Sequence, residues 1–257
     1  MPSAELERAR SCPTEEIQAL LYAAEEEILV ALLENPRLDE QSVVLLLERK
    51  DLSATLLDRI AGHKTWLADR RVRLGLVAHP HAPRRIALRL IRELHVMDIV
   101  ALTLSLTVPA EVRRLGEDLL LGKIAQLALG QKISVARRCS ARVAAALLAE
   151  GRPPVLRVAL ENQRLTEAQV LRVLAAESLP AVVLVAIGQH PKWSTMTAVR
   201  LAVIRHARTP LDTVSAIVAL LPRDALDDLS AMTGLREEVR AVIRRQSEIR
   251  ARPGSLS

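Results

Sequence analysis

The sequence predicts an all-α protein: an α-solenoid of stacked helix pairs that forms a single domain over residues 1–257. Half of the residues are hydrophobic, yet the chain has no phenylalanine, one tyrosine and two tryptophans. A core made of Leu, Val, Ile and Ala suits thin layers of closely stacked helices, and the length suffices for a sizeable core. Nine glycines are few for an α/β enzyme with Gly-rich phosphate loops. Similar segments also recur along the chain, which is typical of helical repeats.

The chain is expected to begin with an acidic cap helix at about 14–33, because residues 1–50 carry 11 acidic and 5 basic side chains. Repeats are expected over 34–235, followed by a polar cap helix over 236–250 and a disordered tail over 251–257. Polar terminal elements are typical of repeat proteins, since an uncapped stack would expose an apolar face.

Pairs of similar segments define the repeats. ALLENPRLDEQSVVLLL (31–47) closely matches VALENQRLTEAQVLRVL (158–174), and GLVAHPHAPRRIALRLI (75–91) has the same form as VAIGQHPKWSTMTAVRLAV (185–203). Breaks between helices fall near Thr107, Gln131, Asn162 and His190. These breaks are 24, 31 and 28 residues apart, which is the length of two short helices and two turns.

One interval is longer than the others. Asn35 and His79 are 44 residues apart. We expect this interval to hold one unit with an insertion, or a degenerate unit around residues 48–60.

Hydrophobic periodicity supports helices inside the units. In the segment 84–94, one apolar stripe contains Ile86, Leu90, Ile91 and Leu94. The opposite face of the same helix contains Arg85, Arg89 and Arg92. The apolar segment 181–187 could be a buried strand by composition alone. Because the segment lies where the repeat pattern places a helix, we interpret it as a buried inner helix.

The polar break HPKWST (190–195) could be a binding loop, but the repeat pattern favours a structural joint. His190 takes the place that Asn35, His79 and Asn162 take in other units. Asn and His tolerate the left-handed conformation that ends many helices, and proline commonly follows such an end.

The residues after this break suggest how the next helix begins. Ser194 or Thr195 is expected to cap it, as Thr166 with Gln169 is expected to form a capping box. Trp193 is expected to pack as a wedge against the neighbouring repeat.

At these residues the sequence resembles the leucine-rich repeat variant and HEAT-like helical repeat proteins of bacteria. The similar segments are ENPRLDEQSVVLLL, ENQRLTEAQVLRVLA, QHPKWSTMTAVRLAV and RHARTPLDTVSAIVALL. The resemblance covers most of 17–245 and implies an α-solenoid but no particular activity. Some leucine-rich repeat variant proteins hold an iron–sulfur cluster on N-terminal cysteines. Cys12 is the only cysteine in that region, so the cluster is not implied here.

Motifs for catalysis or cofactors are scarce. The sequence has no GxxxxGK[ST], GxGxxG or GxSxG motif. His79 and His81 form the only tight histidine pair, and the repeat already accounts for His79. We therefore expect no catalytic residue, no metal and no cofactor.

The cellular compartment is expected to be the cytoplasm. Cys12 and Cys139 do not suggest a disulfide framework, and the charged N-terminus has no signal-like apolar segment. The longest apolar runs are too short to cross a bilayer.

The expected function is that of a non-catalytic scaffold or binding module, which presents a concave surface to a protein or an extended ligand. The chain has a formal net charge of +6, so a nucleic acid or another polyanion is the alternative partner. The candidate binding surface consists of Arg70, Arg71, Arg73, Arg85, Arg89, Arg92, Arg137, Arg138, Lys192 and Trp193.

A DNA base-repair glycosylase is a further alternative, because one class of such enzymes has HEAT-like repeats. Asp69 lies near Trp66 and three arginines in this sequence. Against it, the chain has only three aromatic side chains to stack on bases. The sequence predicts no oligomeric state.

Overall fold

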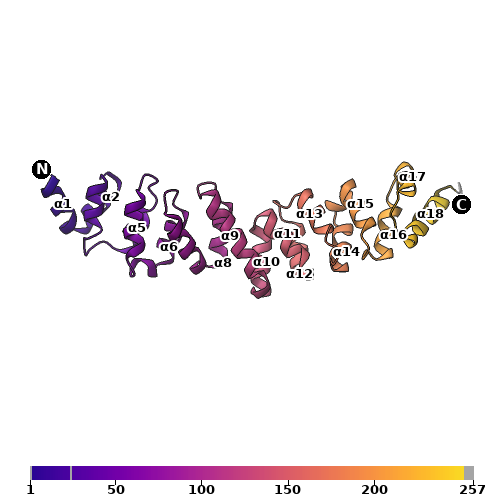
Figure 1. Cartoon of the computed structure of the whole chain (residues 1–257), viewed down its shortest axis with the longest axis horizontal. Coiled ribbons are helices and arrows are strands. Elements are labelled where there is room, and N and C mark those ends of the chain that lie inside the picture. The colour runs from indigo at the N-terminus through magenta and orange to yellow at the C-terminus, as the bar shows by residue number, and fades with distance from the viewer. Residues whose placement is uncertain (1, 24, 252–257) are drawn as a thin grey trace. The chain divides into compact units, whose positions relative to one another are not determined.

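The computed structural model describes residues 2–23 and 25–251, and over these residues the protein is all-α. These residues form 18 α-helices and four short 3-10 helices and include no strand. Figure 1 shows the helices along the chain. The predicted all-α class is therefore confirmed. The segment 181–187, whose composition also allowed a strand, lies in a helix. Residues 252–257, most of the predicted disordered tail, lie outside the described residues.

The chain divides into two compact units, Met1–Lys123 and Ile124–Ser257. The helices of unit 1 are α1 (Pro2–Ser11), α2 (Thr14–Ala23), α3 (Glu26–Leu32), α4 (Glu40–Leu46), α5 (Ala54–Gly62), α6 (Arg70–Ala78), α7 (Arg84–Leu90), α8 (Val96–Leu104) and α9 (Ala110–Lys123). Two 3-10 helices complete this unit, η1 (Trp66–Ala68) and η2 (Ile91–Glu93).

Unit 2 repeats the order of the nine α-helices. Its helices are α10 (Leu129–Arg138), α11 (Ala141–Ala149), α12 (Pro153–Leu160), α13 (Glu167–Leu174), α14 (Ala181–Gln189), α15 (Thr197–Arg205), α16 (Leu211–Ala219), α17 (Arg223–Ala231) and α18 (Glu237–Ala251). The 3-10 helix η3 (Ile124–Gln126) precedes α10, and η4 (Trp193–Thr195) precedes α15.

The α-helices of the two units correspond one to one at an offset of 127 residues. Successive odd-numbered helices of unit 1 begin 24, 28, 30 and 26 residues apart, and the corresponding even-numbered helices of unit 2 have the same four spacings. The offset also aligns identical residues, among them the pairs Cys12/Cys139, Asn35/Asn162, His63/His190, Trp66/Trp193 and His79/His206. The match between 31–47 and 158–174 is thus one part of a duplication that spans the chain.

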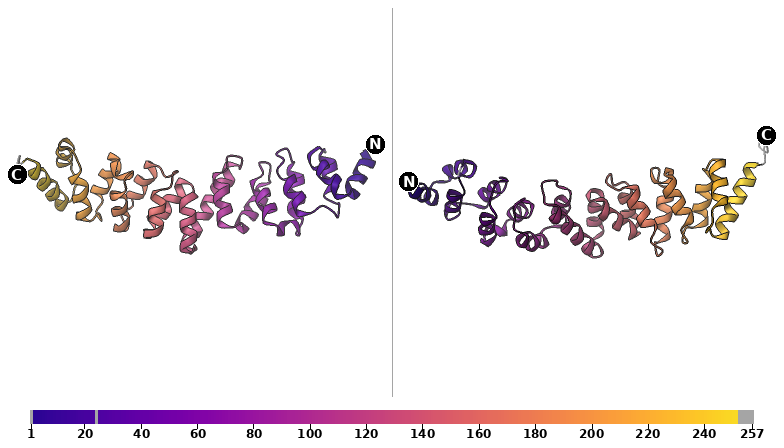
Figure 2. Two further views of the ribbon diagram at one scale, coloured as in Figure 1. Left: turned by 180° about the vertical axis from the view of Figure 1, so that it is seen from behind. Right: turned by 45° about the horizontal axis from the view of Figure 1, so that its top comes forward.

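Each unit has two layers of helices, as the contacts within the unit show (Figure 2). In unit 2, the first layer contains α10, α12, α14, α16 and α18, and each of these helices contacts the next. The second layer contains α11, α13, α15 and α17, of which the first three contact one another in succession. In unit 1, α1, α3 and α5 contact in succession in one layer, and α2, α4 and α6 do so in the other.

Aliphatic side chains between the layers form the core. The predicted stripe Ile86, Leu90, Ile91 and Leu94 is buried, and Arg85, Arg89 and Arg92 are exposed on the other side. Two helix starts have the expected side-chain cap: Asp39 accepts a hydrogen bond from the Ser42 amide, and Thr166 from the Gln169 amide. The Gln169 side chain accepts from Arg172 instead of the Thr166 backbone, so only half of the predicted capping box forms.

The boundaries between repeats differ from the sequence prediction in several places. The segment 14–33 holds two helices, α2 and α3, rather than one cap helix. Gln131 lies inside α10 rather than at a break. The long interval after Asn35 holds a full unit, with α5 and its own break at His63. The predicted C-terminal cap helix corresponds to α18.

Candidate binding groove and the joints around it

Two buried asparagines connect neighbouring repeats in the same way. In unit 1, Nδ2 of Asn35 donates to the carbonyl oxygens of Ala9 at 2.9 Å and Cys12 at 3.2 Å. In unit 2, Nδ2 of Asn162 donates to the carbonyls of Ala136 at 2.7 Å and Cys139 at 3.2 Å. Each asparagine also accepts, through Oδ1, the backbone N–H two residues further on. These side chains therefore satisfy a helix end and tie one repeat to the preceding one.

Two histidines form an equivalent joint, in which the side chain and the carbonyl that it binds are further apart in the sequence. Nε2 of His79 lies 2.7 Å from the Arg49 carbonyl oxygen, and Nε2 of His206 lies 3.1 Å from the Ala176 carbonyl oxygen. In each case Nδ1 accepts the N–H two residues on, so Nε2 carries the proton and donates. The histidines connect residues 30 positions apart, whereas the asparagines reach Ala9 and Ala136 over 26.

The segment 190–195 also contacts the neighbouring repeat, but through Trp193 rather than through the His190 ring, and its conformation differs from the prediction. His190 has φ −72° and ψ 129°, and no non-glycine residue among those described has a positive φ. The left-handed helix end is therefore wrong for this position. The turn is closed instead by the Lys192 amide, which donates to Nδ1 of His190 at 3.2 Å. Burial lowers the pKa of His190, which keeps the imidazole neutral and able to accept this bond.

Ser194 and Thr195 do not cap the next helix as predicted, because both lie in η4. The N-cap of α15 is Met196, whose side chain makes no capping hydrogen bond. Trp193 is fully buried, and its Nε1 donates to the Leu160 carbonyl oxygen at 2.9 Å. Because this carbonyl belongs to the neighbouring repeat, the contact agrees with the expected wedge. Trp193 is not accessible as a binding residue.

Most of the predicted basic surface of unit 1 already has partners within the chain. Arg70 forms an ion pair with the buried Asp98 and holds the pKa of this carboxyl group below its usual value. Arg71 pairs with Asp69, and Arg85 with Asp58 at 2.6 Å. Asp69 also caps α6 by accepting the Arg71 amide.

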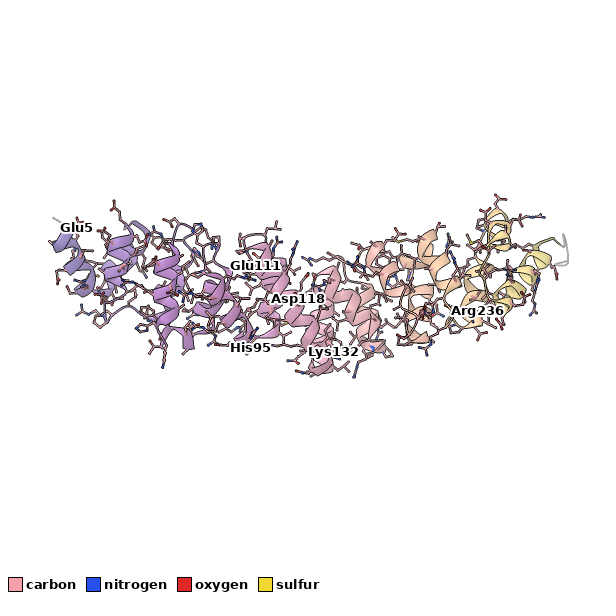
Figure 3. All side chains as sticks on the ribbon, viewed as in Figure 1. Glu5, His95, Glu111, Asp118, Lys132 and Arg236 are labelled. Atoms are coloured by element: carbon pink, nitrogen blue, oxygen red, sulfur yellow. The ribbon has the colours of Figure 1, made fainter. Side chains whose placement is uncertain are left out.

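Arg73 and Arg89 bind backbone carbonyls instead. Arg73 donates to the carbonyls of Leu67 and Ala68, and Arg89 donates to that of Ala61 at 3.0 Å. Arg236, labelled in Figure 3, makes the same kind of contact with Thr209. A guanidinium group suits the free carbonyls at a helix C-terminus, because both its charge and its N–H groups match them.

The remaining predicted surface residues are Arg92, Arg137, Arg138 and Lys192. All four side chains are exposed, and Nζ of Lys192 lies 4.1 Å from the ring centroid of Trp193. Arg92, Arg137 and Arg138 form no ion pair with any described residue. Of the ten predicted residues, Trp193 is thus buried, and five of the six arginines of unit 1 already have partners within the chain.

An apolar groove of about 800 Å³ lies between α12 and α14 in unit 2. Leu156 and Leu160 of α12 line one side, and Val182, Val185 and Ala186 of α14 line the other. Val182 is 39% exposed, although Val183 beside it is fully buried. Arg157 and Glu161 provide charges at the edge. The groove can hold a short apolar segment with polar groups along its border.

The corresponding surface of unit 1 is charged. At the 127-residue offset, Pro153 and Pro154 correspond to Glu26 and Glu27, and Val185 corresponds to Asp58. Unit 1 therefore provides a natural comparison in which the helices are repeated but the side chains at that place are charged rather than apolar.

Lys132 is a buried charged residue that the sequence did not single out. Its side chain is 1% exposed and pairs with Glu150 at the end of α11. The corresponding residue of unit 1 is Glu5, which is exposed; Figure 3 labels both. Because this ion pair is enclosed between helices, it fixes α10 against α11 and offers no open site.

The two histidines of the predicted tight pair have backbone partners. Nδ1 of His81 lies 3.1 Å from the Leu52 carbonyl oxygen, while His79 serves its joint. Among the described residues, no three His, Cys, Asp or Glu side chains lie close enough together to hold a metal ion. Within the same residues, no helix is both long and apolar enough to cross a membrane.

No protein-family model, curated protein or solved structure matches this chain.

Proposed function

We propose that the protein is a non-catalytic binding module, built as an α-solenoid of the HEAT-like or leucine-rich repeat variant kind. The groove between α12 and α14 would hold a short apolar segment of a partner protein. The observation that carries this proposal is the exposed apolar surface of α14, centred on Val182. Exposed apolar patches with a polar border are typical of protein-binding sites.

The arrangement of the arginines supports a protein partner over a nucleic acid. Five of the six predicted basic residues of unit 1 contact carboxylates or carbonyls of the chain. Affinity for a polyanion depends on cations that can reach phosphates, and these side chains have other partners. Trp66 is buried and its ring stacks on His63 at 3.8 Å, so it does not offer a platform for a base.

The groove can be tested by a matched pair of substitutions in the full-length protein. Val182→Asp places a charge in the groove, whereas Thr55→Asp places one at the corresponding exposed position of unit 1. Partners would be captured from a nuclease-treated lysate with each variant and with the unchanged protein. We expect a specific protein that is retained by the unchanged protein and by Thr55→Asp but lost with Val182→Asp. Equal retention by both variants would contradict the proposal.

A further inference from the structure

The two units differ at a pocket beside the groove. In unit 2, a pocket of about 420 Å³ is lined by residues of α14, η4, α15 and α16, including Gly188, Arg200, Thr213 and Ala216. This volume is within the usual range of about 300–1,000 Å³ for ligand sites. Gln189 lines both the pocket and the groove, so the two sites are neighbours on either side of α14.

In unit 1 an arginine side chain occupies the same place. The residue that corresponds to Ala216 is Arg89, and the residue that corresponds to Gly188 is Ala61. Nη2 of Arg89 donates to the Ala61 carbonyl oxygen at 3.0 Å, near the C-terminus of α5. Unit 1 therefore shows what this position of the repeat accommodates: a guanidinium group against a helix end.

Unit 2 keeps the receiving carbonyls but lacks the donor. No described residue donates a hydrogen bond to the carbonyl oxygen of Gly188, and the same is true of the carbonyls of Ser194 and Thr195. The corresponding carbonyls of Leu67 and Ala68 are bound by Arg73 in unit 1. Arg200, the counterpart of Arg73, instead donates to Oγ1 of Thr197 at 3.4 Å.

The walls of the pocket suit an aliphatic stem. Ile217 is buried at its base, whereas Leu220 is 82% exposed at its edge and replaces the Glu93 of unit 1. Arg200 adds a positive charge, but Arg73 and Arg89 coexist at the corresponding positions of unit 1. The positive charge of Arg200 therefore does not exclude a second guanidinium group.

We propose that this pocket binds an arginine side chain of the partner protein, which takes the place that Arg89 fills in unit 1. The proposal rests on the proposed function, because it assigns a specific contact to the partner that occupies the neighbouring groove. The apolar segment would lie between α12 and α14, and the arginine would reach across α14 to the carbonyl of Gly188.

The test is a titration of the full-length protein, with methyl-labelled Ile and Leu observed by NMR. The probes are acetyl-Gly-Arg-Gly-amide, N-propylguanidine and inorganic phosphate. We expect saturable shifts of the Ile217 and Leu220 methyl groups with the arginine peptide. N-propylguanidine should shift the same methyl groups, but saturation should require a higher concentration of this probe. Tighter binding of N-propylguanidine than of the peptide would indicate a small-molecule ligand and overturn the proposal, as would saturable binding of phosphate alone.

Variants at two matched positions complete the test. Ala216 is exposed, so Ala216→Arg should fold and place a guanidinium in the pocket, which should weaken binding of the peptide at least tenfold. Ala216→Leu fills the pocket without the charge and should weaken binding similarly. Arg89→Met should create a second site in unit 1, seen as new shifts at Leu90. Unchanged binding in Ala216→Arg and Ala216→Leu would overturn the proposal.

The outcome can be separated from that of the proposed function. If Val182→Asp abolishes partner capture while no guanidinium probe binds, the proposed function of the groove is supported and the proposed arginine pocket is contradicted. If the probes bind but Val182→Asp retains the partner, the groove fails.

Discussion

Buried side chains at the joints carry much of the specificity of this fold. Asn35 and Asn162 each form hydrogen bonds with both atoms of the side-chain amide. Nδ2 donates to a carbonyl of the preceding repeat, and Oδ1 accepts a backbone N–H of the same turn. A buried polar group without a partner costs free energy, so each joint makes a defined contribution to stability. Cys12 and Cys139 belong to these joints, since their carbonyls accept from the asparagines.

Replacement of Asn162 by alanine should lower the free energy of unfolding by roughly 1–3 kcal/mol, because the carbonyl of Ala136 and the amide of Arg164 lose their partner. Chemical denaturation measures the change. Gln163→Ala is the control, since Gln163 is an exposed neighbour and its replacement should have little effect. Equal losses in the two variants would contradict this role.

His190 should tolerate a change to asparagine. The only hydrogen bond of its ring among the described residues comes from the Lys192 amide, and an asparagine Oδ1 can accept it in the same way, as at Asn162. The free energy of unfolding should therefore fall by less than about 1 kcal/mol. A clearly larger loss, measured by chemical denaturation, would mean that the imidazole has another role.

His79 should make stability depend on pH. Burial lowers its pKa below the usual value of 6.5, so the unfolded chain binds the proton more readily than the folded one. The contribution of His79 to stability is therefore fully present above about pH 6.5 and is lost as the pH falls through the folded pKa. Asp51, with a pKa of about 2, stays ionised across this window. His79→Asn should flatten the pH dependence in urea denaturation, and an unchanged profile would contradict this assignment.

At the scale of the element, α14 shows why the groove was not predicted. Its sequence AVVLVAIGQ is so uniformly apolar that burial on all sides was the natural interpretation. The structure buries Val183, Leu184 and Ile187 but leaves Val182 exposed. A single sequence indicates that a helix is apolar, but it does not indicate which neighbours cover it. The helix itself, the stripe of α7 and the Thr166 cap followed from local patterns and were predicted correctly.

Two substitutions in α14 should distinguish its buried face from its exposed face by their effects on stability. Leu184→Ala should lower the free energy of unfolding by about 2–5 kcal/mol, because Leu184 is fully buried. Val182→Ser should change it by about 0.5 kcal/mol or less, since this side chain faces the open groove. Denaturation midpoints measure both. A large loss with Val182→Ser would mean that the groove is part of the core.

At the scale of the molecule, the offset of 127 residues organises both units, and it was only partly visible in the sequence. The match of 31–47 with 158–174 has this offset. The sequence comparison paired His79 with His190, whereas the structure pairs His190 with His63 and His79 with His206. Repeats within a unit resemble one another enough to obscure the longer period. The arginine–carbonyl contacts were likewise not predictable, because their partners are backbone atoms. Those of Arg89 and Arg236 are also 28 and 27 residues away in the sequence.

Despite the basic net charge of the molecule, its affinity for nucleic acid should depend only weakly on the salt concentration. Replacing Arg85, Arg89 and Arg92 together by alanine should reduce the slope of log affinity against log salt by about one at most. Of these three, only Arg92 lacks a partner among the described side chains and carbonyls. Fluorescence anisotropy with a labelled oligonucleotide measures the slope. A reduction of about three would show that all three arginines reach phosphates.

The different reach of the asparagine and histidine joints has a consequence for how the chain folds. The repeats within a unit resemble one another, so a helix pair could pack against the wrong neighbour during folding. Asn35 meets the Ala9 carbonyl over 26 residues, whereas His79 meets that of Arg49 over 30. A repeat docked one repeat out of register would bury an amide or imidazole away from the carbonyl that it binds in the native stack, and an unpaired buried polar group costs free energy. These side chains therefore make incorrectly packed repeats less stable than correctly packed ones during folding.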